Sequence, residues 1–216
     1  KIYSRQLRVG PPPITFHLLR THDWRLKNQT DFSPQRIGRF LIQSPQSYKS
    51  KLFLFNEIML NIEKTFGSGE HETTKSCLIC LQNLSKIKDF KNILEIGCGS
   101  GILSIISAKL WHTQVTACDI DKDAINVTKL NIIQNLTSKN ILAFIGDGYK
   151  SYLIQKRSPY DLIICNILSG QLMQLSSELV KNLQPRKNGG GFVILSGILK
   201  KQANRVIATH TKHGLK

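Results

Sequence analysis

Between residues 73 and 210, short apolar runs alternate with longer segments of helical periodicity. The apolar runs are NILEI (92–96), QVTAC (114–118), NILAFI (140–145), YDLIICNI (160–167) and GFVILS (191–196). The helical segments cover 73–84, 101–110, 123–135, 171–183 and 200–210. Strands that alternate with helices and are apolar along their whole length belong to a parallel sheet covered on both faces. The sequence therefore predicts a doubly wound α/β fold with a mostly parallel, Rossmann-like sheet, whose ligand lies at the carboxyl ends of the strands.

The first sixty residues differ in kind from the rest. Three prolines at 11–13 force an extended piece, HDWRLKNQTDF (22–32) is compatible with a short helix, and RIGRFLI (36–42) with a strand. We predict two parts: a linker region over 1–60 and a ligand-binding α/β domain over 61–216.

The chain is strongly basic, with 30 Lys and Arg against 14 Asp and Glu and a net charge of +16. About half of this excess lies before residue 52. A positive field attracts polyanions, of which RNA is the first candidate. A solvated basic surface without a partner is the alternative, because no nucleic-acid motif accompanies the charge.

Five cysteines, an odd number in a chain of 216 residues, predict reduced and mostly buried thiols. Cys77 and Cys80 are spaced for an apolar helix and predict core packing, so we predict no metal site. No run of about 18 apolar residues is present, so no membrane partner is expected, and we predict a cytoplasmic protein.

A glycine-rich loop, GCGSG, follows the apolar strand at 92–96 and opens a helix. Gly97, Gly99 and Gly101 can let the backbone approach a ligand closely. A dinucleotide fingerprint would need a sixth-position glycine where this chain has Ile102. The G-x-G-x-G spacing after Glu95 is similar to the loop of class I methyltransferases that use S-adenosylmethionine.

Polar residues end the following strands. Asp119 ends the second strand, where a carboxylate can accept both ribose hydroxyls. Asp121 is placed to cap the next helix. Asp147 could accept a hydrogen bond from an adenine amino group, or be a turn aspartate before Gly148. Asn166 can accept a hydrogen bond from an amine and direct its lone pair at a methyl group.

Five segments in order, FGSGEHETTKSCL (66–78), ILEIGCGSG (93–101), ACDID (117–121), CNILSGQL (165–172) and LSGIL (195–199), resemble the ribosomal protein L11 methyltransferase (PrmA) family. The block at 23–38, with Asp23, Trp24 and Phe32, also resembles it. The resemblance implies that the first glycine segment forms a lid over the methionine part of the cofactor. Phe66, Gly67, Gly69, His71 and Thr74 take the lid positions by this resemblance.

Two of the lid positions also have purely structural explanations. Thr73 and Thr74 could cap the helix that they precede, and His71 could be a surface loop residue rather than a catalytic one. Three departures from the family concern the lid and acceptor pocket: Glu72 and Gln171 stand where the family has proline, and IEKTF replaces an expected Pro-Gly pair. The resemblance also implies that residues 1–60 are a remnant of a separate amino-terminal substrate-recognition domain with its linker. It further implies that the closing hairpin of the sheet is absent or barely begun.

By resemblance, the expected reaction is in-line transfer of the sulfonium methyl to lysine ε-amines or the terminal α-amine of a ribosomal protein. Asn166 and His71 are the catalytic candidates, and Phe66, Thr74, Gly97, Gly99, Gly101, Asp119, Asp147 and Asn166 are the cofactor-binding candidates. Two alternatives stay open. One is an RNA methyltransferase, which would explain the charge through contact with ribosomal RNA, and the other is an inactive fragment that binds cofactor or RNA.

Overall fold

The computed structural model describes residues 33–45, 56–61, 71–185 and 189–216. Five of its strands form one sheet in the order β6-β5-β4-β7-β8. These are β4 (Asn92–Ile96), β5 (Gln114–Asp119), β6 (Ile141–Ile145), β7 (Leu162–Asn166) and β8 (Phe192–Ser196). All four neighbouring pairs are parallel. The predicted doubly wound, mostly parallel sheet is confirmed.

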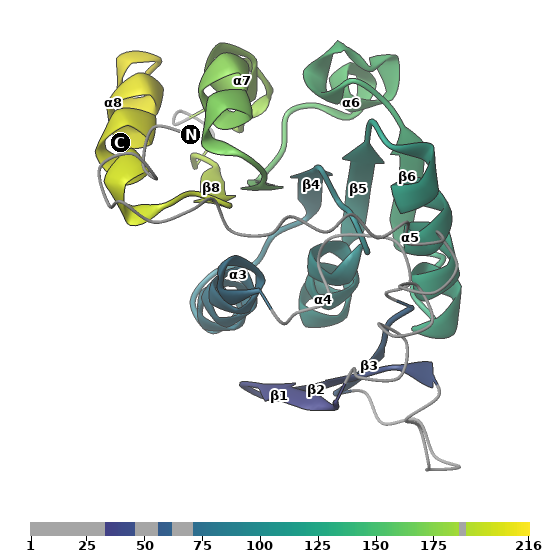
Figure 1. Cartoon of the computed structure of the whole chain (residues 1–216). Coiled ribbons are helices and arrows are strands. Elements are labelled where there is room, and N and C mark those ends of the chain that lie inside the picture. Colours follow the sequence, from purple (N-terminus) through teal and green to yellow (C-terminus); the bar gives the residue numbers. More distant parts are fainter. Residues whose placement is uncertain (1–32, 46–55, 62–70, 186–188) are drawn as a thin grey trace, which may run out of the picture. The chain divides into compact units, whose positions relative to one another are not determined.

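Helices cover the two faces of this sheet (Figure 1). One face carries α3 (Glu72–Leu84), α4 (Ile102–Trp111) and α5 (Lys122–Gln134), and the other carries α6 (Tyr152–Arg157), α7 (Ser169–Asn182) and α8 (Ala203–Lys212). Two apolar clusters correspond to the two faces, and the central strands β4 and β7 contribute alternate residues to each. This double burial explains why these strands are continuous apolar runs.

The central elements lie within two residues of their predicted bounds, but two short elements were not predicted. A 3-10 turn, η2 (Gly148–Lys150), and helix α6 fill the stretch between β6 and β7. Six residues are too few for helical periodicity to emerge from the sequence. At the other end of the domain, helix α8 is preceded by the 3-10 turn η4 (Lys200–Gln202).

The prediction of one strand over 36–42 is wrong. The segment forms a hairpin of β1 (Gln35–Ile37) and β2 (Phe40–Gln43), and β3 (Glu57–Met59) pairs in parallel with β2 to complete a small sheet. Gly38 turns the chain with a φ of +58°, and a Cβ there would overlap the carboxamide of Gln82. A single glycine inside an apolar run was the signal for this turn.

Three carboxamides attach the small sheet to helices α3 and α5. Gln82 accepts a hydrogen bond from Arg39 N at 2.8 Å and donates to Ile37 O at 3.2 Å. Asn135 accepts from Met59 N at 3.0 Å and donates to Met59 O at 2.7 Å. Each amide thus pairs with backbone groups as a neighbouring strand would.

The third carboxamide, Asn131, is fully buried and joins the small sheet to the glycine loop. Its Oδ1 accepts a hydrogen bond from Asn61 N at 2.8 Å. Its Nδ2 donates to Ser100 O at 2.8 Å, inside the loop that follows β4. One side chain therefore contacts both the segment after β3 and the glycine loop.

Residues 32–216 form one compact unit. The predicted boundary at residues 60 and 61 stays a prediction, and the helix expected at 22–32 lies outside the described residues. Within the described part of the chain, no helix has both the length and the apolar character needed to cross a bilayer.

Candidate functional site

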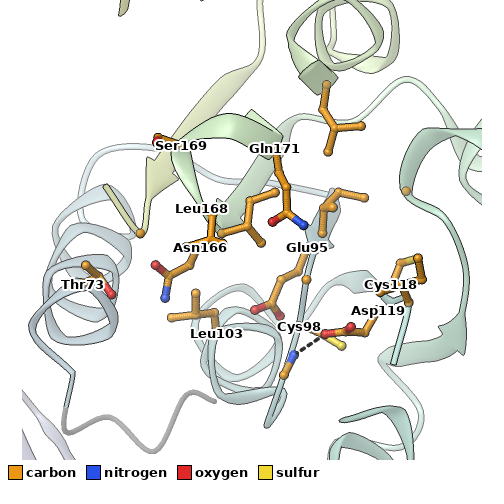
Figure 2. A pocket seen from close by; sticks show the side chains of 18 of the residues that line it. Thr73, Glu95, Cys98, Leu103, Cys118, Asp119, Asn166, Leu168, Ser169 and Gln171 are labelled. Atoms are coloured by element: carbon orange, nitrogen blue, oxygen red, sulfur yellow. Dashed lines mark hydrogen bonds between the residues drawn. The ribbon is translucent and has the colours of Figure 1, made fainter. Parts of the chain in front are cut away.

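A cavity of about 760 Å³ opens at the carboxyl ends of the strands of the parallel sheet (Figure 2). Its lining comes from the loops after β4, β5, β6, β7 and β8 and from the start of α3. This volume is typical of small-molecule sites. The cavity lies where a doubly wound sheet is expected to bind its ligand.

The glycine loop forms one wall of the cavity. Gly97, Gly99 and Gly101 have φ values of +71°, +56° and +79°, in the left-handed region. A Cβ on Gly97 would overlap the Cγ2 of Ile167, so the loop after β4 and the loop after β7 can approach closely only with glycine here. Helix α4 begins directly after Gly101.

Asp119 lies at the end of β5, opposite the glycine loop. Its Oδ2 accepts a hydrogen bond from Gly99 N at 2.9 Å, drawn as the dashed line in Figure 2, and its Oδ1 accepts from Asp121 N at 3.0 Å. Each carboxylate oxygen has a further lone pair for a ligand. The backbone thus fixes the orientation of this carboxylate in the wall of the cavity. As predicted, Asp121 caps the next helix by accepting from Asp123 N at 2.8 Å.

Asp147 lines the cavity after β6, but its side chain is 59% exposed. Its Oδ2 pairs with the ammonium of Lys150 at 2.6 Å, and this hydrogen bond raises the pKa of Lys150. Asp147 also precedes the 3-10 turn η2, which agrees with the alternative that it is a turn aspartate before Gly148. An adenine contact stays a prediction.

Asn166 and Thr74 meet in the cavity although 92 positions separate them in the sequence. Asn166 Nδ2, at the end of β7, donates a hydrogen bond to Thr74 Oγ1 at 3.3 Å. Thr74 is 1% exposed. Asn166 Oδ1 is buried and has no hydrogen-bond partner among the described residues. A buried amide oxygen without a partner is costly, so Oδ1 is available to accept a hydrogen bond, and its contact with a ligand stays a prediction.

The start of α3 differs from the predicted capping arrangement. His71 is the N-cap residue, and its Nδ1 accepts a hydrogen bond from Thr73 N at 3.3 Å. The alternative that Thr73 or Thr74 caps this helix is therefore wrong, and Thr74 is free to contact Asn166. His71 is exposed and lines the cavity, and its catalytic role stays a prediction. Phe66, Gly67 and Gly69 lie outside the described residues.

Glu95 is a cavity residue to which the sequence assigned no role of its own. It is 2% exposed, and Ser104 Oγ donates a hydrogen bond to its Oε2. Burial raises the pKa of Glu95 to about 8, with a smaller contribution from the nearby Asp119. The signal was present as a single acid inside the apolar strand NILEI. Glu95, Asp119 and Asn166 surround the same cavity in Figure 2.

The lining of the cavity is acidic, in contrast to the chain as a whole. Asp119 and Asp147 line it together with Glu95, which is neutral below about pH 8, and the described lining residues include no Lys or Arg. At the mouth, three apolar side chains are exposed, namely Ile120, Leu168 and Leu199. The cavity is therefore suited to a cationic ligand that approaches past an apolar rim.

The cysteines are free thiols, four of them buried. The core prediction is confirmed for Cys77 and wrong for Cys80, which lies on the exposed side of α3. Burial raises the pKa of Cys98 well above its usual value, as expected of a packed residue rather than a nucleophile.

Comparisons with known proteins agree with this geometry. The sequence model of the family "Ribosomal protein L11 methyltransferase (PrmA)" matches residues 2–216. The ribosomal protein L11 methyltransferase of Rhizobium meliloti (strain 1021) is 37% identical over 206 residues, which is 94% of this chain and 69% of the relative.

Solved structures give the same result. A ribosomal protein L11 methylase from Lactobacillus delbrueckii subsp. bulgaricus has a TM-score of 0.66 at 25% identity, covering 82% of this chain and 85% of the other. An O-methyltransferase from Bacillus cereus in complex with SAH has a TM-score of 0.53 at 17% identity, covering 66% and 70%, and shares the fold.

Proposed function

Because the chain belongs to the ribosomal protein L11 methyltransferase (PrmA) family, we propose that it methylates lysine ε-amines or the terminal α-amine of ribosomal protein L11. The chain is an S-adenosylmethionine-dependent methyltransferase. The cofactor supplies an electrophilic methyl group on a positively charged sulfur.

The residues of the cavity fit this cofactor. The acidic lining suits its positive charge, and the unpartnered Oδ1 of Asn166 offers an acceptor for a bound donor group. The glycine at position 97 lets Ile167 pack against the loop after β4, which brings two walls of the cavity together. The volume of about 760 Å³ accommodates a nucleoside with its amino-acid part.

In this proposal, Asp119 accepts the ribose hydroxyls while Gly99 N and Asp121 N hold its carboxylate in place. Gly97, Gly99 and Gly101 form the wall beside the methionine part, and Thr74 holds that part from the opposite side. Asp147 receives the adenine amino group, and Phe66 and His71 complete the lid by family resemblance. The carboxylate of Asp119 is already held by two backbone N–H groups, so it needs little reorganisation when a ligand binds.

The single observation that carries the amine specificity is the orphaned Oδ1 of Asn166. An acceptor amine that donates a hydrogen bond to this oxygen has its nitrogen lone pair oriented by the amide. Thr74 fixes the amide by accepting from Nδ2 at 3.3 Å. Correct orientation of nucleophile, methyl carbon and leaving sulfur provides most of the rate enhancement in such a transfer.

The amine must attack in its neutral form, because an ammonium has no lone pair. A free lysine has a pKa of about 10.4. Burial in a cavity entered past Leu168 and Leu199 lowers this pKa by desolvation. We assign no dedicated general base. With the cofactor held by Asp119 and the glycine loop, it would supply the methyl group to the amine nitrogen and would leave as a neutral thioether, and the amine would lose its proton to water.

The family membership favours this function over an RNA methyltransferase or an inactive fragment. A contact with ribosomal RNA through the basic side chains belongs to the same proposal, because RNA accompanies a ribosomal acceptor and the net charge is +16. A ribosomal acceptor also supports the cytoplasm as the place of action.

Radiolabelled S-adenosylmethionine tests the proposal, with purified L11 and ribosomal RNA as parallel acceptors. We expect label in L11, none in RNA, and loss of label for Asp119→Ala. Label confined to RNA, or absent from both acceptors while the cofactor still binds, would refute it.

A further inference from the structure

The basic excess of the chain is concentrated at its two ends. Residues 52–161 contain twelve Lys and Arg against eleven Asp and Glu, so they are nearly neutral. From residue 162 onward there are eight Lys and Arg against one acid, Glu178, which gives a net charge of +7 over 55 residues. The carboxyl-terminal part of the α/β domain is therefore a second strongly basic region, separate from the one before residue 52.

Four of these eight cations lie on η4 and α8, and all four are exposed: Lys200, Lys201, Arg205 and Lys212. We call them the α8 basic surface. Arg205 and Lys212 are seven residues apart, which places them on one side of α8, about 10 Å apart at 1.5 Å per residue. Lys200 and Lys201 lie in η4, directly before the first turn of this helix.

No acid in the described part of the chain is paired with this surface. The segment 179–216 contains neither Asp nor Glu. The neighbouring Glu178 is paired with Lys181 on the same helix at 2.7 Å. Among the described residues, the ion pairs are Lys75–Glu72, Lys150–Asp147 and Lys181–Glu178, and none includes the α8 basic surface.

The α8 basic surface adjoins the mouth of the cavity. Leu199 and Gln202, which flank Lys200 and Lys201 in the chain, both line the cavity. Helix α8 begins at the next residue and packs against α7. A polyanion on α8 would therefore lie beside the point where an acceptor amine enters, whereas the cavity itself is acidic and would repel it.

We infer that the α8 basic surface binds the phosphodiester backbone of RNA next to the bound acceptor. The choice of RNA rests on the proposed ribosomal substrate, while the surface itself rests on its charge and position. Four exposed cations in one short segment, without an ion pair among the described residues, suit the closely spaced negative charges of a nucleic-acid strand. Such contacts position the strand without reading its sequence.

Charge reversal on α8 tests the inference by fluorescence anisotropy with a short labelled single-stranded RNA over a series of salt concentrations. The test variant is Lys201→Glu/Arg205→Glu/Lys212→Glu. The matched control is Lys86→Glu/Lys88→Glu/Lys91→Glu, which makes the same charge change at exposed lysines before the amino end of β4. Circular dichroism verifies folding, and Lys201→Gln/Arg205→Gln/Lys212→Gln replaces the test variant if it does not fold.

We expect the test variant to lose RNA affinity by roughly two powers of ten at low salt while the control keeps most of it. The slope of log Kd against log salt should flatten by about 2, because each single-strand phosphate contact contributes about 0.7. Equal losses in both variants, or no RNA binding by the unaltered protein, would overturn the inference.

Polyglutamate as a competitor decides between RNA and an acidic protein partner. If it displaces RNA at equal charge concentration, the surface binds acidic protein and the RNA assignment is wrong. Methyl transfer to isolated L11 without RNA is measured in parallel and should be equal in all variants. If the protein binds RNA but does not methylate isolated L11, the proposed function is contradicted. The inference that the α8 basic surface binds RNA is then unaffected.

Discussion

Asn166 Nδ2 donates a hydrogen bond to Thr74 Oγ1 at 3.3 Å, and this bond leaves the amide oxygen as the unpartnered atom of the pair. The end of β7 and the first turn of α3 are thereby joined inside the cavity. The bond fixes the plane of the amide, so the unpartnered oxygen has a defined direction before any ligand binds.

Replacing Asn166 by Ala should reduce kcat/KM for the acceptor by about 10²–10³, the usual loss for one preorganised polar group. The Kd of S-adenosylmethionine, measured by calorimetry, should rise by a smaller factor. Asn126→Ala, at an exposed position of α5, is the control. If cofactor affinity falls as much as kcat/KM, Asn166 holds the donor and does not orient the amine.

Thr74 supplies an internal check of the same prediction. Thr74→Ser keeps the hydroxyl and should retain activity, while Thr74→Val removes the partner of Asn166. A double variant with Asn166→Ala should be little worse than Asn166→Ala alone, because residues that act as a unit are not additive.

Asp119→Ala should weaken cofactor binding by about 2–3 kcal/mol through loss of charge-assisted hydrogen bonds. Part of the loss is indirect, since Gly99 N and Asp121 N lose their acceptor. Asp123→Ala, at an exposed acid in the first turn of α5, is the control for the loss of one negative charge. Unchanged cofactor affinity in Asp119→Ala would exclude the ribose assignment.

Glu95 makes the stability of the protein depend on pH. Its folded pKa of about 8 lies above the ordinary value of 4.5, so between these values the folded state keeps a proton that the unfolded state has released. The contribution of Glu95 to the free energy of unfolding should therefore be largest below about pH 4.5. This contribution should fall as the pH rises toward 8. The decrease is on the order of a few kcal/mol.

Urea unfolding of Glu95→Gln and the unaltered protein at about pH 5 and about pH 8 measures this effect. The free energy of unfolding of Glu95→Gln should not show the part of the decrease that Glu95 causes. At about pH 8 the variant should therefore gain stability relative to the unaltered protein. Glu72→Gln, at an exposed residue of α3, should leave the pH dependence unaltered. Parallel pH profiles for all three proteins would show that Glu95 ionises normally.

Binding of S-adenosylmethionine should release a proton near neutral pH. A positive charge in the cavity stabilises the ionised form of Glu95 and lowers its raised pKa. Calorimetry in two buffers of different ionisation enthalpy counts the released protons, and Glu95→Gln should release fewer. Equal release from both proteins would assign the proton to another group.

Asn131→Ala should lower the free energy of unfolding by about 1–3 kcal/mol per polar group left unpaired in the interior. Both Asn61 N and Ser100 O lose a partner in this variant. Thermal unfolding, with Asn126→Ala as control, measures the loss. A variant as stable as the control would mean that water replaces both bonds.

The sequence predicted the strand NILEI and the loop after it well, because apolar runs and glycines are local signals. The hairpin at Gly38 was not predicted because its strands are only three and four residues long, too short for an alternating pattern to emerge. The roles of Asn131 and Gln82 could not be predicted, since an amide on a helix resembles a solvated surface residue until its backbone partner is known.

The same reason applies to the site. Asp119 was found because strand ends meet at one edge of a parallel sheet. The pairing of Thr74 with Asn166 depends on packing between segments 92 positions apart, which no local pattern records.

The bridge formed by Asn131 has a mechanical consequence for the domain. Its amide holds Asn61 on one side and Ser100 on the other, so the small sheet and the glycine loop share one rigid support. A displacement of Asn61 would therefore alter the hydrogen bond to Ser100 O, in the loop that borders the cavity.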